Sequence, residues 1–200
     1  MSGGEDGDVL MYFVLEKGGE PIAAESTSAL ADADKMTQDF KPGKYFEVDS
    51  FSFGVDLADD EGGSLDEGGD SRSYARWRAL KDDTPKPEPA FQPEPQEMSF
   101  ERRIDSASPA LLLHCLNSRS FDKAILVKRA RGRSKEGKME GILRMEFSEV
   151  RLNAVEWRDG DIVMEVCKFR FAAVKVGYRK RKPDGSTEAM WACVWDSRNG

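Results

Sequence analysis

Runs and alternations of apolar residues predict a chain built mainly from β-strands. Residues 9–15 form a continuous apolar run of strand length, and Gly18-Gly19 interrupts it. Residues 46–56 alternate between polar and apolar side chains, which indicates a strand with one end in the core. The same criteria predict strands near residues 122–129, 141–151 and 162–178, and a closing strand at 190–195.

The alternation in the predicted strand 162–178 changes phase partway along. Phe169 and Phe171 lie on one face of this strand, whereas Val174 continues the apolar set at the opposite parity. Because side chains alternate with a period of two, such a change moves the apolar set to the other face. We therefore expect a β-bulge or a sharp bend at Ala172-Ala173.

Two short helices are predicted. The Ser108 hydroxyl can cap a helix that begins there, and Pro109 at the first helical position loses no hydrogen bond. Leu111, Leu112, Cys115 and Leu116 form the apolar face of this helix, and we expect Leu112 and Leu116 to pack onto the strands. Apolar residues near helical spacing favour a second helix within residues 28–40.

Residues 57–96 differ in composition from the rest of the chain. They are rich first in glycine and acidic residues and then in proline, a composition that favours extended, poorly packed chain. Tyr74, Trp77 and Leu80 form an apolar island within this stretch, spaced three residues apart. The island either packs as a half-turn of helix against its own barrel or docks onto a neighbouring subunit.

These elements together predict the fold. We expect a closed antiparallel β-barrel of two packed sheets, with one flanking α-helix and long loop insertions. At 200 residues, the chain fits a single domain spanning 1–200, with insertions at about 18–44 and 57–96.

Composition narrows the class of protein. Hydrophobic residues make up 39% and charged residues 34% of the chain, so a core of modest size can form. No apolar run approaches the roughly 18 residues that span a bilayer. The acidic N-terminus lacks the features of a signal peptide, so we expect the chain to start in the cytoplasm without membrane insertion.

The charge is distributed unevenly along the chain. Residues 1–70 carry 18 acidic and 4 basic residues, whereas the remainder carries 19 acidic and 26 basic residues. The net charge of −7 is unfavourable for generic nucleic-acid binding. The asymmetry instead favours attraction between parts of the molecule or between copies.

Basic residues gather around a predicted hairpin at residues 128–138 and at residues 179–182. Three interpretations stay open: a solvated rim, a subunit contact that faces the acidic half, or a surface for the phosphate backbone of a nucleic acid. Our candidate subunit-contact residues are Tyr74, Trp77, Leu80, Arg129, Arg131 and Arg133.

The residue types needed for catalysis or metal binding do not form a recognisable set. His114 is the only histidine and lies in the predicted apolar helix, where a packed, hydrogen-bonded role is expected. Cys115, Cys167 and Cys193 lack metal-ligand spacing and are interpreted as small buried hydrophobes. Residues 132–139 resemble a phosphate-binding loop but end in Met139 and precede a strand. We therefore expect no catalytic site, no metal and no cofactor.

The order of motifs resembles one known family. Residues 99–109 read SFERRIDSASP and match the pattern S-F-x-[RK]-x-x-D-x-[AS]-S-P, which is followed by an apolar helix. Residues 174–178 read VKVGY and match a strand that ends V-x-V-x-Y. This series, over about residues 97–182, is similar to the haemolysin-coregulated protein (Hcp) family of the bacterial type VI secretion system.

The resemblance implies a structural role. Members of that family form barrels with a flanking helix, and six copies close into rings that stack into a tube. The contractile sheath expels this tube, which implies sheath and spike proteins as partners, small effectors in the lumen and secretion from the cytoplasm. The alternative from the residues alone is a monomeric β-barrel that binds nucleic acid through the basic hairpin 128–138.

Overall fold

The computed structural model describes residues 7–30, 34–58, 92–95, 97–131, 139–180, 182 and 190–198. The chain divides into two compact units. The main unit comprises Met1–Phe53 and Glu97–Gly200, and the small unit comprises Gly54–Gln96. In the small unit, β4 (Val55–Ala58) pairs antiparallel with β5 (Gln92–Pro95).

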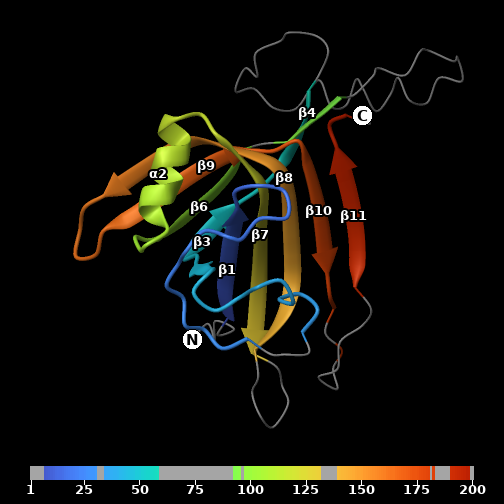
Figure 1. The fold of residues 1–200 in the computed structure, drawn as a ribbon. Coiled ribbons are helices and arrows are strands. Elements are labelled where there is room, and N and C mark those ends of the chain that lie inside the picture. Colours follow the sequence, from blue (N-terminus) through green and yellow to red (C-terminus); the bar gives the residue numbers. More distant parts are fainter. Residues whose placement is uncertain are drawn as a thin grey trace, which may run out of the picture. The chain divides into compact units, whose positions relative to one another are not determined.

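The main unit is built on one antiparallel sheet of nine strands in the order β2-β1-β7-β8-β9-β6-β3, with β10 and β11 branching from β8 (Figure 1). The sheet contains β1 (Gly7–Val14), β2 (Phe46–Glu47), β3 (Ser50–Ser52), β6 (Met98–Arg103), β7 (Ser120–Arg131), β8 (Met139–Arg158), β9 (Met164–Arg170), β10 (Ala173–Tyr178) and β11 (Trp191–Asp196). The prediction of a mainly β, antiparallel fold is confirmed. The strand predicted at 46–56 is divided among β2, β3 and β4.

The two ends of the strand order, β2 and β3, are consecutive in the chain. The Val48 amide donates to the Val9 carbonyl of β1 at 2.8 Å, and the Asp49 amide donates to the Glu101 carbonyl of β6 at 2.8 Å. No ladder joins β2 to β3 among the described residues, so hydrogen bonds do not close the sheet. The prediction of a closed barrel made of two packed sheets is therefore not confirmed, since one continuous sheet carries the core.

Phenylalanine rings fill the centre of the main core. The Phe13 ring lies 4.9 Å from Phe121, 5.9 Å from Phe169 and 6.0 Å from Phe100, measured between ring centroids. All four side chains are almost fully buried and come from β1, β6, β7 and β9. Strands that are distant in the sequence thus share one aromatic cluster, whose tilted and edge-on pairs stabilise it beyond simple burial.

The predicted change of phase in strand 162–178 corresponds to the break between β9 and β10. Across the break the two strands keep the same register against β8, with Arg170 opposite Arg151 and Ala173 opposite Ser148, and the register of β9 shifts only farther along, between Leu152 and Ala154. Glu149 of β8 has a positive φ of 53°, which L-residues seldom adopt, and lies beside this break. Because no residue is inserted, the feature is a sharp bend at the predicted position and not a β-bulge.

Helix α2 (Ser108–Leu116) begins where the sequence predicted and has Pro109 in its first turn. Its packing differs from the prediction, because Leu111 is fully buried whereas Leu116 is 73% exposed and Leu112 is only partly buried. The N-cap position is occupied by Ala107, with no side-chain cap, since the Ser108 hydroxyl is used elsewhere. α2 is the only helix among the described residues.

The insertion at 18–44 covers the outer face of β1 and β7. Turns replace the helix predicted there in residues 35–39, and residues 28–30 are irregular. Its apolar side chains nevertheless build a second core on the strands. This outer core contains Leu10, Tyr12, Val14, Met36, Phe40, Tyr45, Ile125 and Val127.

Asp34 fastens this insertion to distant parts of the main unit. One carboxylate oxygen accepts the Gly141 amide at 2.7 Å, and the other accepts the Met36 amide at 3.0 Å and the Arg179 guanidinium at 3.2 Å. Gly141 allows this approach, because a Cβ at this position would lie 2.4 Å from the Met36 Cβ. Real Cβ atoms do not come so close, so the absence of a side chain at Gly141 is required.

β11 lies at an edge of the sheet, although the sequence predicted a closing strand there. It pairs only with β10 among the described strands, from Ala173 opposite Asp196 to Tyr178 opposite Trp191. Its second edge makes no ladder within the described part of the chain. An unpaired edge can accept a further strand, which makes it a candidate contact surface.

Replacing Leu111 by alanine should destabilise the protein by about 2–5 kcal/mol, because a fully buried leucine leaves a cavity when truncated. The matched control is Leu116→Ala on the same helix, which should change the free energy of unfolding by less than about 0.5 kcal/mol. Urea denaturation measures both. Equal losses for the two variants would show that α2 does not pack as described.

Replacing Gly141 by alanine should cost about 1–3 kcal/mol, because the added methyl group collides with Met36 and loosens the outer core. Gly160→Ala is the control, since a Cβ there would meet only the Ile162 carbonyl oxygen at 3.7 Å. Hydrogen exchange should become faster in residues 34–40 of the Gly141 variant. Unchanged protection of that segment would contradict the close contact.

Candidate functional site

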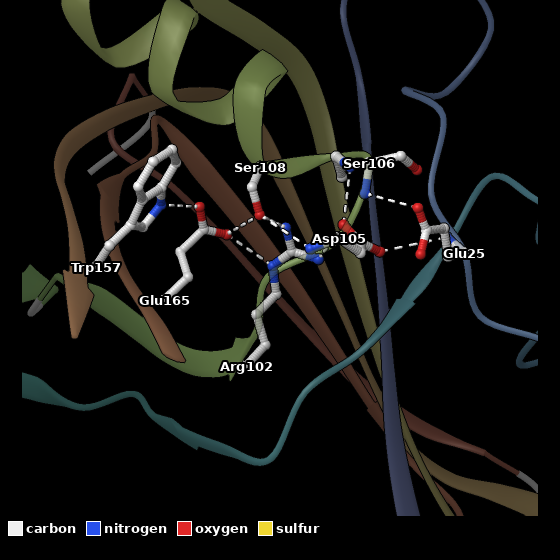
Figure 2. Close-up of polar contacts among 8 residues, drawn as sticks. Glu25, Arg102, Asp105, Ser106, Ser108, Trp157 and Glu165 are labelled. Atoms are coloured by element: carbon white, nitrogen blue, oxygen red, sulfur yellow. Dashed lines mark hydrogen bonds and ion pairs between the residues drawn. The ribbon is translucent and has the colours of Figure 1, made fainter. Parts of the chain in front are cut away.

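A cluster of buried polar side chains lies where β6 ends and α2 begins (Figure 2). Arg102 is fully buried, and its Nε donates to Glu165 Oε2 of β9 at 2.8 Å. Its two Nη groups donate to Asp105 Oδ1 at 2.7 Å and to the Ser108 hydroxyl at 2.8 Å. The guanidinium carbon lies 4.0 Å from the centre of the Phe46 ring. One arginine thus joins two strands to the first residue of the helix.

Glu165 is the anion of this cluster and is also fully buried. Besides Arg102, its Oε2 accepts the Ser108 hydroxyl at 3.2 Å, and its Oε1 accepts the Trp157 indole N–H at 2.8 Å. A buried carboxylate stabilises the fold only when its oxygens have such partners. Among the described residues, no buried side-chain polar atom lacks a hydrogen-bond partner.

Asp105 links the cluster to the insertion at 18–44. Its Oδ1 accepts the Ala107 amide at 2.8 Å, and its Oδ2 accepts the Glu25 amide at 3.2 Å. The Glu25 carboxylate returns a bond by accepting the Ser106 amide at 3.2 Å (Figure 2). The turn before α2 and the start of the insertion therefore hold each other in place.

The hydrogen bonds and ion pairs of this cluster hold elements of the fold together and do not form a reactive site. Arg102 forms ion pairs with both Asp105 and Glu165, and the buried polar atoms of the cluster all have hydrogen-bond partners within the described residues. A shallow groove of about 320 Å³ lies beside them, with Glu25, Glu47 and Asp105 among its lining residues. The groove brings no histidine or thiol to these carboxylates. We therefore assign the cluster a positioning role.

Cys167 points into the core beside Glu165. Burial raises the pKa of its thiol, and the charge of the Glu165 carboxylate raises it further. The thiol is therefore held in its unreactive, protonated form. The expectation that all three cysteines are buried is wrong, since Cys115 is partly exposed and Cys193 is exposed.

His114 has the packed role that the sequence predicted. Its Nδ1 lies 3.0 Å from the Ala110 carbonyl oxygen, so this nitrogen carries a proton and donates. Its ring stacks on Phe121 with centroids 4.5 Å apart. Within the described ranges, no three side chains gather as metal ligands, and no helix is both long and apolar enough to cross a bilayer.

The predicted subunit-contact residues fall into two groups. Arg129 is 2% exposed, and it bonds the Asp8 carboxylate through Nε at 2.8 Å and the Ala29 carbonyl through Nη1 at 2.7 Å. Its guanidinium is therefore used inside the subunit. Arg131 is the last residue of β7. The remaining candidates, Tyr74, Trp77, Leu80 and Arg133, lie outside the described residues.

The sequence points to Arg102 and Asp105 only as parts of the motif at residues 99–109 and to Ser108 also as a helix cap, whereas it does not predict Glu165 or Trp157 as site residues. The structure brings all five together. One signal was present, because Glu165 occupies an inward position of its strand, at the same parity as the buried Cys167 and Phe169. A single acid within an apolar face implies a buried cation, but it does not say which one.

The family described as "Type VI secretion system effector, Hcp" matches residues 37–178, which is more than half of the chain. The chain therefore belongs to the Hcp family of the type VI secretion system. Among curated proteins no sequence matches this chain.

Solved structures share the fold at low sequence identity. Hcp1 from Salmonella typhimurium is 17% identical with a TM-score of 0.59, and the match covers 96% of each chain. A mutant of Hcp1 from the E. coli EAEC 042 pathovar is 15% identical with a TM-score of 0.62, over 95% of this chain and 98% of that one. Hcp3 from Pseudomonas aeruginosa is 13% identical with a TM-score of 0.55, over 96% and 99% of the two chains.

Replacing Arg102 by methionine should destabilise the protein by about 3–5 kcal/mol, because Glu165 is left buried without its cation. The double variant Arg102→Met/Glu165→Leu should recover most of this loss, since neither charge then remains. Arg170→Met is the matched control, because Arg170 also pairs with a glutamate, Glu97, but is 77% exposed. An equal free energy of unfolding for the two arginine variants would contradict the assignment.

Proposed function

We propose that this chain is the inner-tube subunit of a type VI secretion system, assembling into stacked hexameric rings that the contractile sheath expels. The family match over residues 37–178 carries this proposal. The buried polar atoms of the Arg102 cluster all have hydrogen-bond partners, which fits a rigid structural part better than a catalyst. The subunit is a non-enzyme that works in the cytoplasm, leaves through the apparatus with small effectors in its lumen, and meets sheath and spike proteins.

The barrel of each subunit is closed by the chain itself at residues 46–52. Val48 and Asp49 support this closure, since they bond to Val9 and Glu101 at the two ends of the strand order. A subunit of an expelled tube must resist deformation, and a segment that bonds both ends provides such resistance. The whole chain is then one barrel domain, with insertions at about 18–44 and 57–96.

The alternative of a nucleic-acid-binding module has no support in the comparisons. One cation of the basic stretch 128–138 is also not free to bind phosphate, because the Arg129 guanidinium is bonded to the Asp8 carboxylate and the Ala29 carbonyl. A cation that is already paired and buried adds little to a phosphate-binding surface.

The insertion 57–96 provides the contact between stacked rings. Its apolar island, Tyr74, Trp77 and Leu80, anchors this contact, and Arg131 and Arg133 face the acidic half of the next ring. The basis is the sequence, in which an acidic first third precedes a basic remainder. Exposed charges are screened within about 8 Å at physiological salt, so they steer stacking more than they hold it.

The purified protein should have the mass of a hexamer by light scattering or native mass spectrometry at micromolar concentration. Ring closure by one repeated contact is the physical reason, since a cyclic assembly satisfies every interface. The control is the same protein after urea denaturation and without refolding, which should run as a monomer. A folded protein that stays monomeric at tens of micromolar, without tubes under crowding, would overturn the proposed function.

Removing residues 60–95 should leave single rings intact and shorten the tubes, because the deletion takes away the stacking contact only. Trp77→Ala should have the same effect in weaker form, and raising the salt concentration should slow tube growth. Negative-stain microscopy measures tube length, and native mass spectrometry measures the mass of the hexamer. Together they distinguish a loss of ring stacking from a loss of ring closure. Unchanged tube length after the deletion would show that the insertion has another role.

A further inference from the structure

The β8–β9 hairpin carries an exposed apolar patch near its turn. Trp157 and Ile162 are each 48% exposed, and Ile104 from the loop before α2 is 43% exposed. Ile104 lies beside the hairpin, since its amide donates to the Val163 carbonyl at 3.3 Å. Trp157, Ile162 and Ile104 form what we call the hairpin patch.

The Trp157 ring is held in place before any partner arrives. Its indole N–H donates to Glu165 Oε1 at 2.8 Å, and Glu165 is itself fixed by Arg102 and Ser108 (Figure 2). An exposed tryptophan with one orientation loses little conformational entropy on binding. Such preorganised aromatic side chains are typical of residues that dominate the energy of an interface.

A second apolar patch lies on the ribbon formed by β10 and β11. Val194 is 70% exposed, and Met190, just before β11, is 46% exposed. Ala192, between them at the same parity, is also exposed. The outer edge of β11 makes no ladder within the described part of the chain. Val194, Met190 and Ala192 form what we call the ribbon patch.

The turn of the β8–β9 hairpin and the β10–β11 ribbon carry charges of opposite sign. Asp159 and Asp161 lie in the hairpin turn, and they make no ion pair within the described residues. Lys175 lies opposite Val194 in the ribbon, and Lys180 follows β10; both are exposed and make no ion pair with described residues. The hairpin turn and the ribbon therefore offer charges of opposite sign, and Arg103, exposed next to Ile104 and opposite Met164, adds a cation at the other edge of the hairpin patch.

The β8–β9 hairpin and the β10–β11 ribbon lie on opposite sides of the main unit (Figure 1). Two different, complementary patches on opposite sides cannot both be covered by a two-fold contact between identical surfaces. They suit a head-to-tail contact, in which each copy offers its hairpin to the ribbon of the next. Such a contact closes into a ring when the rotation between copies divides a full turn.

We propose that the occupant of the ribbon patch is the hairpin patch of a second copy of this chain, and that this is the lateral contact of the ring. Trp157 and Ile162 of one copy pack on Val194 of the next, with Asp159 and Asp161 facing Lys175. The inference rests on the proposed ring-forming function. It goes further by naming the two surfaces that close the ring.

Site-directed cross-linking tests the pairing of the two surfaces. In a Cys115→Ser/Cys193→Ser background, which leaves only the buried Cys167, Ile162→Cys is placed in the hairpin patch and Ala192→Cys in the ribbon patch, and a short bismaleimide is added. The double variant should give a ladder up to the hexamer under denaturing electrophoresis. Each single variant should stop at monomer, and a mixture of the two single variants should give dimers only.

A charge exchange provides an independent arm that does not depend on the engineered cysteines. Lys175→Glu should weaken ring association roughly tenfold or more, since it places like charges in contact. Asp159→Lys/Asp161→Lys should weaken it similarly, and the three changes together should restore it. Leu116→Asp is the control, because this exposed leucine lies on α2 in neither patch and should leave the rings unchanged.

The outcomes separate this inference from the proposed function. Hexamers that persist in every charge variant, together with no ladder from the double cysteine variant, would overturn the lateral contact and leave the ring-forming function standing. A parent protein that never forms hexamers would overturn both. A ladder together with charge rescue would establish the contact.

Discussion

The arrangement of α2 and the strands beneath it depends on one buried ion pair, between Arg102 of β6 and Glu165 of β9. Removing two charges from water is costly, and their attraction compensates only when the remaining hydrogen-bonding positions are filled. Here Ser108, Asp105 and Trp157 fill them, so the pair orients the start of the helix, the turn before it and an exposed aromatic ring. A hydrophobic pair of the same volume could fill the space, but it would not orient the helix start, the preceding turn and the Trp157 ring.

The insertion at 18–44 follows a second constraint, which is that both faces of β1 and β7 are apolar. Leu10 and Tyr12 point away from the main core, and Val127 of β7 does the same. Without a cover, this outer face would be an exposed apolar patch of the kind that promotes association. Met36 and Phe40 provide the cover, and Asp34 fastens it through Gly141 and Arg179. The extra chain length is therefore part of the subunit's stability.

The two surface patches connect the interior of the subunit to its assembly. Trp157 takes its orientation from Glu165, so the buried pair that holds α2 also prepares the hairpin patch. The ribbon patch arises because β10 leaves β9 at the bend and pairs with β11, whose far edge meets no described strand. In the proposed ring contact, the hairpin patch is rigid because Trp157 is held by Glu165, and the ribbon patch has an unpaired strand edge. A rigid surface that meets an unpaired edge favours association of copies in a single register.

The sequence by itself determined most of the long strands, the start of α2 and the place where β9 gives way to β10, because each depends on neighbours within a few residues. Pro109 marks a helix start locally, and the change of parity after Phe171 requires either a bulge or a bend at that position whatever lies around it. The resemblance of residues 99–109 to a known pattern likewise needed only the order of residues. The family was thereby predicted before any contact was known.

Only the tertiary structure decided which residues meet. Leu111 and not Leu116 is buried, because the Ser108 hydroxyl bonds to Arg102 and Glu165 and sets the rotation of α2. The sequence suggests that Arg129 is a surface cation, yet its side chain is buried and bonded to Asp8, 121 positions earlier in the chain. The predicted helix at 28–40 gives way to turns, since packing on β1 and β7 outweighs a weak local preference. Such outcomes depend on partners far away in the chain, and no local pattern specifies which distant strand supplies the partner.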